Sequence, residues 1–156
     1  MQKFRSNTII GVIGGGHCSR DIEILAENVG ENIARQGGIL ICGGLYGVME
    51  AACRGAKKQG GTTIGILPGA DKSEANRFVD IPIVTGLADA RNVIIARTAD
   101  GVIAVNGEYG TLSEIAFCLK FNKPVVGLQT WGVDAGIVAA NDAKEAVDKI
   151  FRMIDT

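Results

Sequence analysis

Short runs of aliphatic residues alternate with amphipathic stretches along the whole chain. The aliphatic runs are rich in Ile and Val and are often bounded by glycine, which is typical of strands buried on both faces of a parallel sheet. Pro82 lies inside one run and indicates an edge or irregular strand, because proline cannot donate a hydrogen bond to a neighbouring strand. The predicted strands cover residues 8–13, 39–42, 62–67, 79–84, 101–105 and 125–128, with a short seventh candidate at 137–139.

Helical periodicity fills most of the segments between these runs. Apolar residues recur three and four positions apart, with charged residues on the opposite side. The alternation predicts an α/β fold: a three-layer α/β/α, doubly wound (Rossmann-like) and mostly parallel sheet of six or seven strands. With no internal repeat or linker, residues 1–156 are interpreted as a single Rossmann-like nucleotide-binding domain. The predicted helices cover residues 19–37, 46–59, 88–99, 110–121 and the segment from 142 onward, and the polar segment 70–77 is expected to be a mobile loop.

Composition narrows the class of protein. Hydrophobic residues make up 47% of the chain but aromatic residues only 5%, so the core must be aliphatic. The formal net charge of −1 lacks the basic excess of a nucleic-acid-binding protein, and no apolar stretch approaches the ~18 residues of a membrane span. The first seven residues are polar and do not resemble a signal peptide. The four cysteines are irregularly spaced, which favours reduced thiols, and we expect a cytoplasmic protein.

Three glycine-rich loops follow predicted strands, at residues 14–18, 43–47 and 106–110. In doubly wound sheets, ligands bind beyond the carboxyl ends of the strands, where all three loops would lie. The helix that begins at Gly110 would present unpaired N–H groups and the positive end of its dipole, which suits a phosphate. Glu114 lies one helical turn beyond Gly110 and can face the same cleft. The pattern therefore predicts a site for a phosphorylated ligand.

Several common kinds of site do not fit the sequence. A standard NAD site needs an acidic residue at the end of the second strand, where this chain has Cys42 and two glycines. No G-K-[ST] sequence occurs, which excludes a Walker-type nucleotide triphosphatase. His17 is the only histidine and has no closely spaced cluster of further ligands, so no metal site is predicted. From its spacing in the sequence alone, we interpret Arg91 as a surface arginine or as an ion-pair partner of Asp89.

Two motifs in sequence order resemble those of the LOG-like nucleotide-binding family, whose members have been labelled lysine decarboxylases and are related to the DprA/Smf proteins. Residues 43–49 match the family stretch G-G-x-x-G-x-M in full. Arg91 stands where the family has its catalytic arginine. The resemblance covers about residues 9–128. The family sequence P-G-G-x-G-T-x-x-E is matched at Gly107, Gly110, Thr111 and Glu114.

The resemblance implies a function and a set of site residues. Well-known family members are phosphoribohydrolases, which split a nucleoside 5′-monophosphate into the free base and ribose 5-phosphate. By this resemblance Glu114 and Arg91 are catalytic: Glu114 stabilises the oxocarbenium charge or orients water, and Arg91 keeps Glu114 ionised. No metal or cofactor is required, and pairing through residues 88–99 and 110–121 implies a homodimer or higher homo-oligomer. The expected phosphate- and nucleotide-binding residues are Gly14, Gly15, Gly16, Gly43, Gly44, Gly47, Met49, Glu50, Asn92, Gly107, Glu108, Tyr109, Gly110 and Thr111.

The sequence departs from the family pattern at three positions. Asn106 replaces the motif proline, Glu108 replaces its second glycine, and Asn92 replaces the lysine that usually follows the arginine. A Glu108 carboxylate inside a phosphate cradle would repel a dianion, unless the side chain turns to solvent or the ligand differs. These departures and the short chain resemble the subgroup of small members that includes the molybdenum cofactor carrier, which holds a phosphate-bearing pterin. Because Arg91 and Glu114 are both present, a hydrolase is the first hypothesis; a non-catalytic carrier of molybdenum cofactor and a nucleotide sensor are the alternatives.

Overall fold

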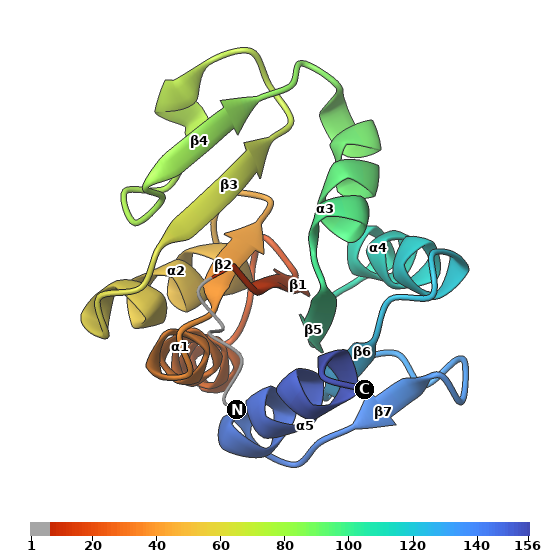
Figure 1. Ribbon diagram of the computed structural model, residues 1–156. Coiled ribbons are helices and arrows are strands. Elements are labelled where there is room, and N and C mark those ends of the chain that lie inside the picture. The colour runs from red at the N-terminus through yellow and green to blue at the C-terminus, as the bar shows by residue number, and fades with distance from the viewer. Residues whose placement is uncertain (1–6) are drawn as a thin grey trace.

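Seven parallel strands form one sheet between two layers of helices (Figure 1). The computed structural model describes residues 7–156, so the signal-peptide expectation for the N-terminal segment falls almost wholly outside it. The predicted α/β doubly wound fold is confirmed, and every strand pair is parallel. The strands are β1 (Ile9–Gly14), β2 (Ile39–Cys42), β3 (Thr63–Leu67), β4 (Ile81–Val84), β5 (Gly101–Val105), β6 (Val125–Leu128) and β7 (Ile137–Ala139).

Two groups of helices cover the two faces of the sheet. The helices α1, α2 and α5 pack over one face, and α3 and α4 pack over the other (Figure 1). Within the described residues, no helix is long and apolar enough to cross a membrane. The helices are α1 (Arg20–Arg35), α2 (Val48–Lys58), α3 (Asn92–Thr98), α4 (Tyr109–Lys120) and α5 (Ala143–Ile154), with 3₁₀ turns η1 (Lys72–Glu74) and η2 (Ala88–Arg91).

The strand order places a ligand crevice at the middle of the sheet. The order is β4-β3-β2-β1-β5-β6-β7, so the chain builds outward on one side from β1 and on the other side from β5. The connections that follow β1 and β5 therefore diverge to opposite faces, which leaves an opening beyond the carboxyl ends of these two strands. The edge position predicted from Pro82 is confirmed, because β4 pairs with β3 alone.

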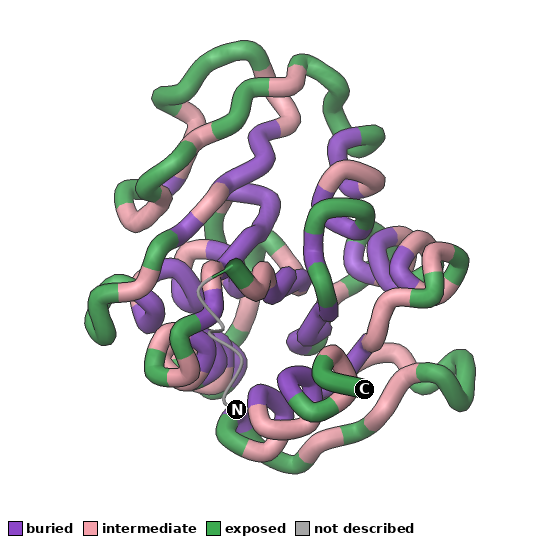
Figure 2. The backbone as a smooth tube through the Cα atoms, in the orientation of Figure 1, coloured by how far each residue is buried: buried purple, intermediate pink, exposed green. Residues whose placement is uncertain are grey.

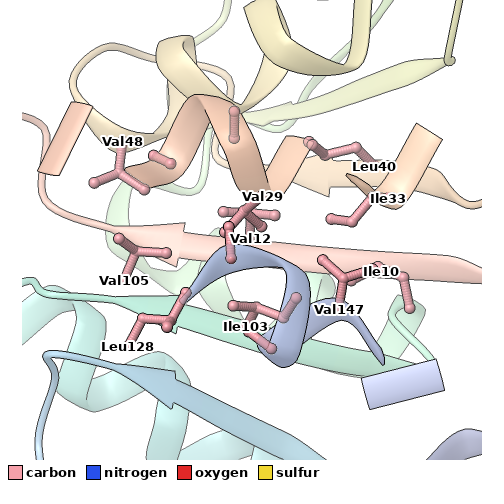
Figure 3. Close-up of a cluster of buried hydrophobic side chains, with 14 of the residues drawn as sticks. Ile10, Val12, Val29, Ile33, Leu40, Val48, Ile103, Val105, Leu128 and Val147 are labelled. Atoms are coloured by element: carbon pink, nitrogen blue, oxygen red, sulfur yellow. The ribbon is translucent and has the colours of Figure 1, made fainter. Parts of the chain in front are cut away.

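The larger core cluster is aliphatic, as the composition predicts. Side chains from the central strands meet those of α1, α2 and α5 in this cluster, and Figure 3 shows Val12, Val29 and Val147 from three of these elements together. A smaller cluster lies under α3 and α4. Figure 2 shows the buried residues concentrated in the central strands and on the inner helix faces, whereas much of β4 and the loops beside it is exposed.

The three cysteines that fall in apolar segments are buried, as expected of small hydrophobic side chains. Cys42, Cys53 and Cys118 have no exposed surface or almost none, and Cys18 is half-buried. All four are free thiols. Burial raises the pKa of the Cys118 thiol to about 12, so this side chain stays protonated and unreactive.

Three of the differences between the predicted and the observed elements have a structural explanation. The second helix begins at Val48 and not at Tyr46, because Gly47 has a positive φ of 62° that ends the preceding loop. Residues 88–91 form the 3₁₀ turn η2 before α3 begins. The segment predicted as a mobile loop contains η1, and its Asn76 is buried: the side-chain amide donates to the Leu45 carbonyl at 2.7 Å. This segment is therefore tied to the second glycine loop.

Helices α1 and α2 pack with their backbones in close approach. A Cβ atom built on Gly30 of α1 would lie 1.9 Å from the carbonyl oxygen of Ala52, and one on Gly55 of α2 would lie 1.9 Å from the carbonyl oxygen of Glu27. Both contacts are to backbone, which cannot rotate away as a flexible side chain can. Arg54 strengthens the contact with salt bridges to Glu27 and to Glu23. Only glycine fits at these two positions of the interface.

We predict that Gly30→Ala lowers the free energy of unfolding by about 1–3 kcal/mol, as overpacking does in other cores. The alanine gains up to about 1 kcal/mol of helix propensity, so a net loss must come from the helix contact. Urea unfolding followed by circular dichroism measures the change. Gly132→Ala is the control, because nothing lies within 4 Å of its Cβ position. A Gly30→Ala variant as stable as wild type would contradict the close approach.

Candidate functional site

A cavity of about 270 Å³ opens beyond the carboxyl ends of β1 and β5. This is the place where the strand order reverses. The volume is just below the ~300–1,000 Å³ typical of pockets for drug-sized ligands, which suits one mononucleotide-sized group and not a dinucleotide. The cavity is lined by Val12, Ile13, Gly14, Gly15, Gly16, His17, Gly43, Met49, Asp89, Arg91, Asn92, Glu108, Gly110, Thr111 and Glu114.

The loop between β5 and α4 has a conformation that proline could not adopt. Asn106, which stands at the position of the family proline, has a φ of 51°, whereas proline is fixed near −65°. The Asn106 N–H donates to the Leu128 carbonyl at 2.9 Å, and its Oδ1 accepts from the Gly107 N–H at 2.7 Å. Gly107 has a φ of 97°, and a Cβ there would lie 2.2 Å from Thr111 Oγ1. The departure at Asn106 therefore fits a differently shaped loop.

The helix starts that follow the three glycine loops differ in how their backbone N–H groups are bonded. Ser19 caps α1 by accepting from the Ile22 N–H at 3.3 Å. The first N–H of α2, from Val48, donates to the Gly15 carbonyl at 3.0 Å. The N-cap of α4 is Glu108, whose side chain makes no capping hydrogen bond. The first-turn amides of α4 are thus open to an anion in the cavity.

The loop that follows β6 supports the glycine loop that precedes α4. Thr130 Oγ1 donates to the Asn106 carbonyl at 2.7 Å, and Trp131 Nε1 donates to the Glu108 carbonyl at 3.1 Å. The rings of Trp131 and Tyr109 lie 6.0 Å apart, and Tyr109 is 80% exposed. The Glu108 side chain is also exposed, so its carboxylate stands at the mouth of the cavity in contact with water.

Arg91 is buried, which corrects its interpretation from spacing as a surface or ion-paired side chain. It is 7% exposed, and no salt bridge joins it to Asp89 within residues 7–156. Its Nε–H donates to the Ile66 carbonyl at 2.9 Å, and its Nη1–H donates to Asn92 Oδ1. The guanidinium is therefore fixed at the end of β3 and lines the cavity.

Glu114 is buried in the cavity wall and is 8% exposed. No side chain or backbone group of residues 7–156 donates a hydrogen bond to its carboxyl group. Burial raises the pKa of Glu114 to about 8, and the nearby Arg91 charge lowers it only in part. The expectation that Arg91 keeps Glu114 ionised stays a prediction; the Arg91 charge acts in that direction, and burial opposes it in the ligand-free protein.

The structure brings most of the expected site residues to one cavity. Five of the expected residues do not line it: Gly44 and Gly47 shape the second loop, Gly107 shapes the third, Tyr109 points to solvent, and Glu50 lies on α2. His17 and Asp89 line the cavity although neither belongs to the matched motifs, and Val12 and Ile13 form part of its apolar floor. Val12 and Ile13 were not among the expected site residues. Their position at the end of a buried strand, just before a glycine loop, could have identified them. Among the described residues, no group of three His, Cys, Asp or Glu side chains could hold a metal ion.

Comparison with known proteins places the chain in a family. The family model described as the SLOG cluster4 family matches residues 7–154. The chain belongs to this SLOG family. The family assignment agrees with the LOG-like resemblance of the glycine motifs.

Solved structures similar to this SLOG chain include two molybdenum cofactor proteins. The molybdenum cofactor binding protein of Rippkaea orientalis is 38% identical, with a TM-score of 0.89 over 94% of this chain and 97% of that one. The molybdenum cofactor carrier protein of Chlamydomonas reinhardtii is 40% identical, with a TM-score of 0.88 over 96% and 99% of the two chains. Both similarities extend over nearly the whole of each chain.

Two further matches are more distant. The cytokinin riboside 5′-monophosphate phosphoribohydrolase of Mycobacterium tuberculosis is 32% identical over 74% of this chain and 66% of that protein. DNA processing protein A of Streptococcus pneumoniae is 18% identical with a TM-score of 0.73, which shows a shared fold alone. The absence of a nucleic-acid partner therefore stays a prediction.

We predict that Glu114→Gln removes a pH dependence of stability. Because the folded state holds the Glu114 proton more tightly than the unfolded chain, wild-type stability falls as the pH rises from about 4.5 to about 8. Glutamine carries no such proton, so the stability of the variant exceeds that of wild type increasingly across this range. At about 1.4 kcal/mol per pKa unit, the difference reaches a few kcal/mol above pH 8.

Urea unfolding at pH 5 and pH 9, followed by Trp131 fluorescence, measures this difference. Glu108→Gln is the matched control, because its carboxylate lies at the same cavity but is exposed to water. We expect the difference in stability between Glu108→Gln and wild type to be the same at pH 5 and at pH 9. If the difference between Glu114→Gln and wild type is also the same at both pH values, the buried carboxyl group does not titrate as described.

Proposed function

We propose that this chain binds a phosphorylated, nucleotide-sized heterocycle in the cavity and serves as a carrier of molybdenum cofactor. The observation that carries the proposal is the cavity wall, in which the Arg91 guanidinium and the open first-turn amides of α4 lie beside the apolar side chains of Val12, Ile13 and Met49. Glu114 is buried in the same wall, and burial favours its neutral form, which can donate a hydrogen bond to a ligand.

The place available for a phosphate group also supports a phosphorylated, nucleotide-sized ligand. The phosphate would lie at the first turn of α4, against the free amides near Gly110 and Thr111, and within reach of the Arg91 charge. Val12, Ile13 and Met49 give the inner wall an apolar surface for a planar ring. The cavity volume of about 270 Å³ leaves room for one such ring and its phosphate-bearing part. The identity of 38–40% with the two molybdenum cofactor proteins over nearly their full lengths supports this carrier function.

The second candidate function is phosphoribohydrolysis of a nucleoside 5′-monophosphate. It is favoured by the presence of both Arg91 and Glu114 and by the 32% identity with the mycobacterial hydrolase. A bound substrate whose ring becomes cationic would lower the pKa of Glu114 and so restore the charge that catalysis needs. Hydrolysis would need no metal or further cofactor. The two functions differ in a directly measurable product, the free base.

We predict saturable binding of molybdenum cofactor under anaerobic conditions, with slower oxidation of the bound cofactor than of the free one. We also predict no release of base from AMP, GMP, CMP or UMP, measured by chromatography. Release of base by wild type that is lost in Glu114→Gln would replace the carrier function with the hydrolase. Failure to bind the cofactor together with an absence of hydrolysis would contradict both functions.

The exposed Glu108 carboxylate allows a finer test of where the phosphate lies. A like charge about 4 Å away in water costs about 1 kcal/mol, which corresponds to roughly fivefold in affinity. Glu108→Gln should therefore strengthen the binding of a phosphorylated ligand by roughly that factor. Glu50→Gln is the control, because Glu50 lies outside the cavity. Equal affinities for the two variants would place the phosphate away from the first turn of α4.

We also propose that two copies of the chain pair over α3 and the neighbouring part of the sheet. Ile81 and Ile83 of β4 are 47% and 43% exposed, and Ile81 pairs in register with Ile64 of β3. Paired residues of parallel strands point to the same face, so these side chains extend the apolar face that α3 covers only in part. A second copy supplies a matching apolar surface under two-fold symmetry. The homodimer implied by the family resemblance would thus include β4 as well as the helices.

We predict that the wild-type chain sediments as a dimer or larger homo-oligomer at micromolar concentration and that Ile83→Lys sediments as a monomer. The lysine would bring an unpaired charge into an apolar contact. Ile24→Lys is the matched control, because Ile24 is exposed to a similar extent, 45%, but lies on α1. A wild-type monomer, or an Ile83→Lys variant that still pairs, would rule out this interface.

A further inference from the structure

The protein itself holds Arg91 on two sides. The Nε–H donates to the Ile66 carbonyl at the end of β3, at 2.9 Å, and the Nη1–H donates to Asn92 Oδ1. Nη2 has no acceptor among residues 7–156, and it lies beside Gly43, where a Cβ would be only 2.8 Å away. Nη2 is thus the guanidinium nitrogen left for a ligand.

The amide of Asn92 connects this guanidinium to the first turn of α4. Its Oδ1 accepts from Arg91, and its Nδ2 donates to Ser113 Oγ at 3.4 Å, the longest contact in the series. Ser113 Oγ in turn donates to the Gly110 carbonyl at 2.7 Å. Because both ends of the amide are engaged, its orientation is fixed, and it presents an oxygen to Arg91. Asn92 is itself buried, at 4% exposed, so water competes little for these contacts.

Glu114 follows Ser113 on the same helix, yet it has no hydrogen-bond donor. A buried guanidinium and a buried carboxylate that line one cavity would ordinarily pair, since each is costly to bury alone. Arg91 is the only arginine or lysine among the described residues that line the cavity. The ionisable groups that line the cavity with Glu114 are Arg91 and Asp89 of η2, His17 of the first loop and Glu108 at the N-cap of α4, and the thiols of Cys42 and Cys118 lie close enough to sense its charge.

We propose that Asn92 and Ser113 are positioning residues that hold the Arg91 guanidinium apart from Glu114. The guanidinium then presents Nη2 to an acceptor group of the ligand, and the Glu114 carboxyl group is left for a second contact. These hydrogen bonds also connect Arg91 to Gly110. The guanidinium and the backbone N–H groups of α4 therefore keep a fixed spacing around one bound anion. The proposed function supplies the purpose of this arrangement, but the hydrogen bonds and their test require no ligand.

Nuclear magnetic resonance of the ligand-free protein tests the proposal with two readouts. A guanidinium held at both Nε and Nη1 rotates slowly about the Nε–Cζ bond, and this rotation exchanges Nη1 with Nη2, so the Nη1 and Nη2 signals of Arg91 should be separate in wild type. The ¹³C shift of the Glu114 carboxyl group should titrate with a midpoint near pH 8. Arg91→Lys and Glu114→Gln assign the two sets of signals.

In Asn92→Ala, the Arg91 signals should merge, and the Glu114 midpoint should fall by roughly one unit or more as the freed guanidinium approaches the carboxylate. Ser113→Ala should change both readouts in the same direction but less, and Ser113→Thr, which keeps the hydroxyl, should resemble wild type. Thr98→Ala, which removes an exposed hydroxyl at the end of α3, is the control.

Separate Arg91 signals in Asn92→Ala, or an unchanged or higher Glu114 midpoint, would overturn the proposal. If Asn92→Ala does not fold, Ser113→Ala with Ser113→Thr decides by the same criteria. None of these outcomes depends on whether the chain carries or cleaves a ligand, so the positioning role and the proposed function can fail separately.

Discussion

The reversal of strand order between β1 and β5 is the constraint on which the rest of the structure depends. The connections after these strands diverge to opposite faces of the sheet, so no helix can cover the carboxyl ends of β1 and β5. Glycine loops fill the edge of the opening, because the backbone must approach closely there: a Cβ on Gly14 would lie 2.6 Å from the Val105 carbonyl. The cavity is therefore a consequence of topology, and the loops determine what it can bind.

The electrostatics of the cavity follow from burial more than from pairing. Arg91 is stabilised by a backbone carbonyl and an amide, whereas no group of residues 7–156 donates a hydrogen bond to Glu114 or forms a salt bridge with it. Where a carboxyl group is buried away from water, its neutral form is favoured unless a cation or a hydrogen-bond donor offsets the desolvation of the charged form. Family motifs specify which residues surround a site, but the protonation state of Glu114 depends on a separation that Asn92 and Ser113 help to set.

The sequence predicted more of the fold than of the site. Aliphatic runs and helical periodicity identified all seven strands and every α-helix, since both signals depend on which residues are buried. The boundaries at Gly47 and at residues 88–91 were missed, because a positive φ and a 3₁₀ turn leave no periodic signal. The burial of Asn76 was missed for a similar reason: its partners are backbone carbonyls of a loop 31 residues earlier in the chain.

The sequence by itself predicted a site for a phosphorylated ligand beside Gly110 and Glu114, because a helix start that follows a glycine loop in a parallel sheet suits an anion. It also showed the departures at Asn92, Asn106 and Glu108. Only the tertiary structure decided what these departures do: Asn106 adopts a φ closed to proline, the Glu108 side chain reaches water, and Asn92 holds Arg91. Each outcome depends on contacts between residues far apart in sequence or on exposure to solvent, and neither is encoded by the spacing of a motif.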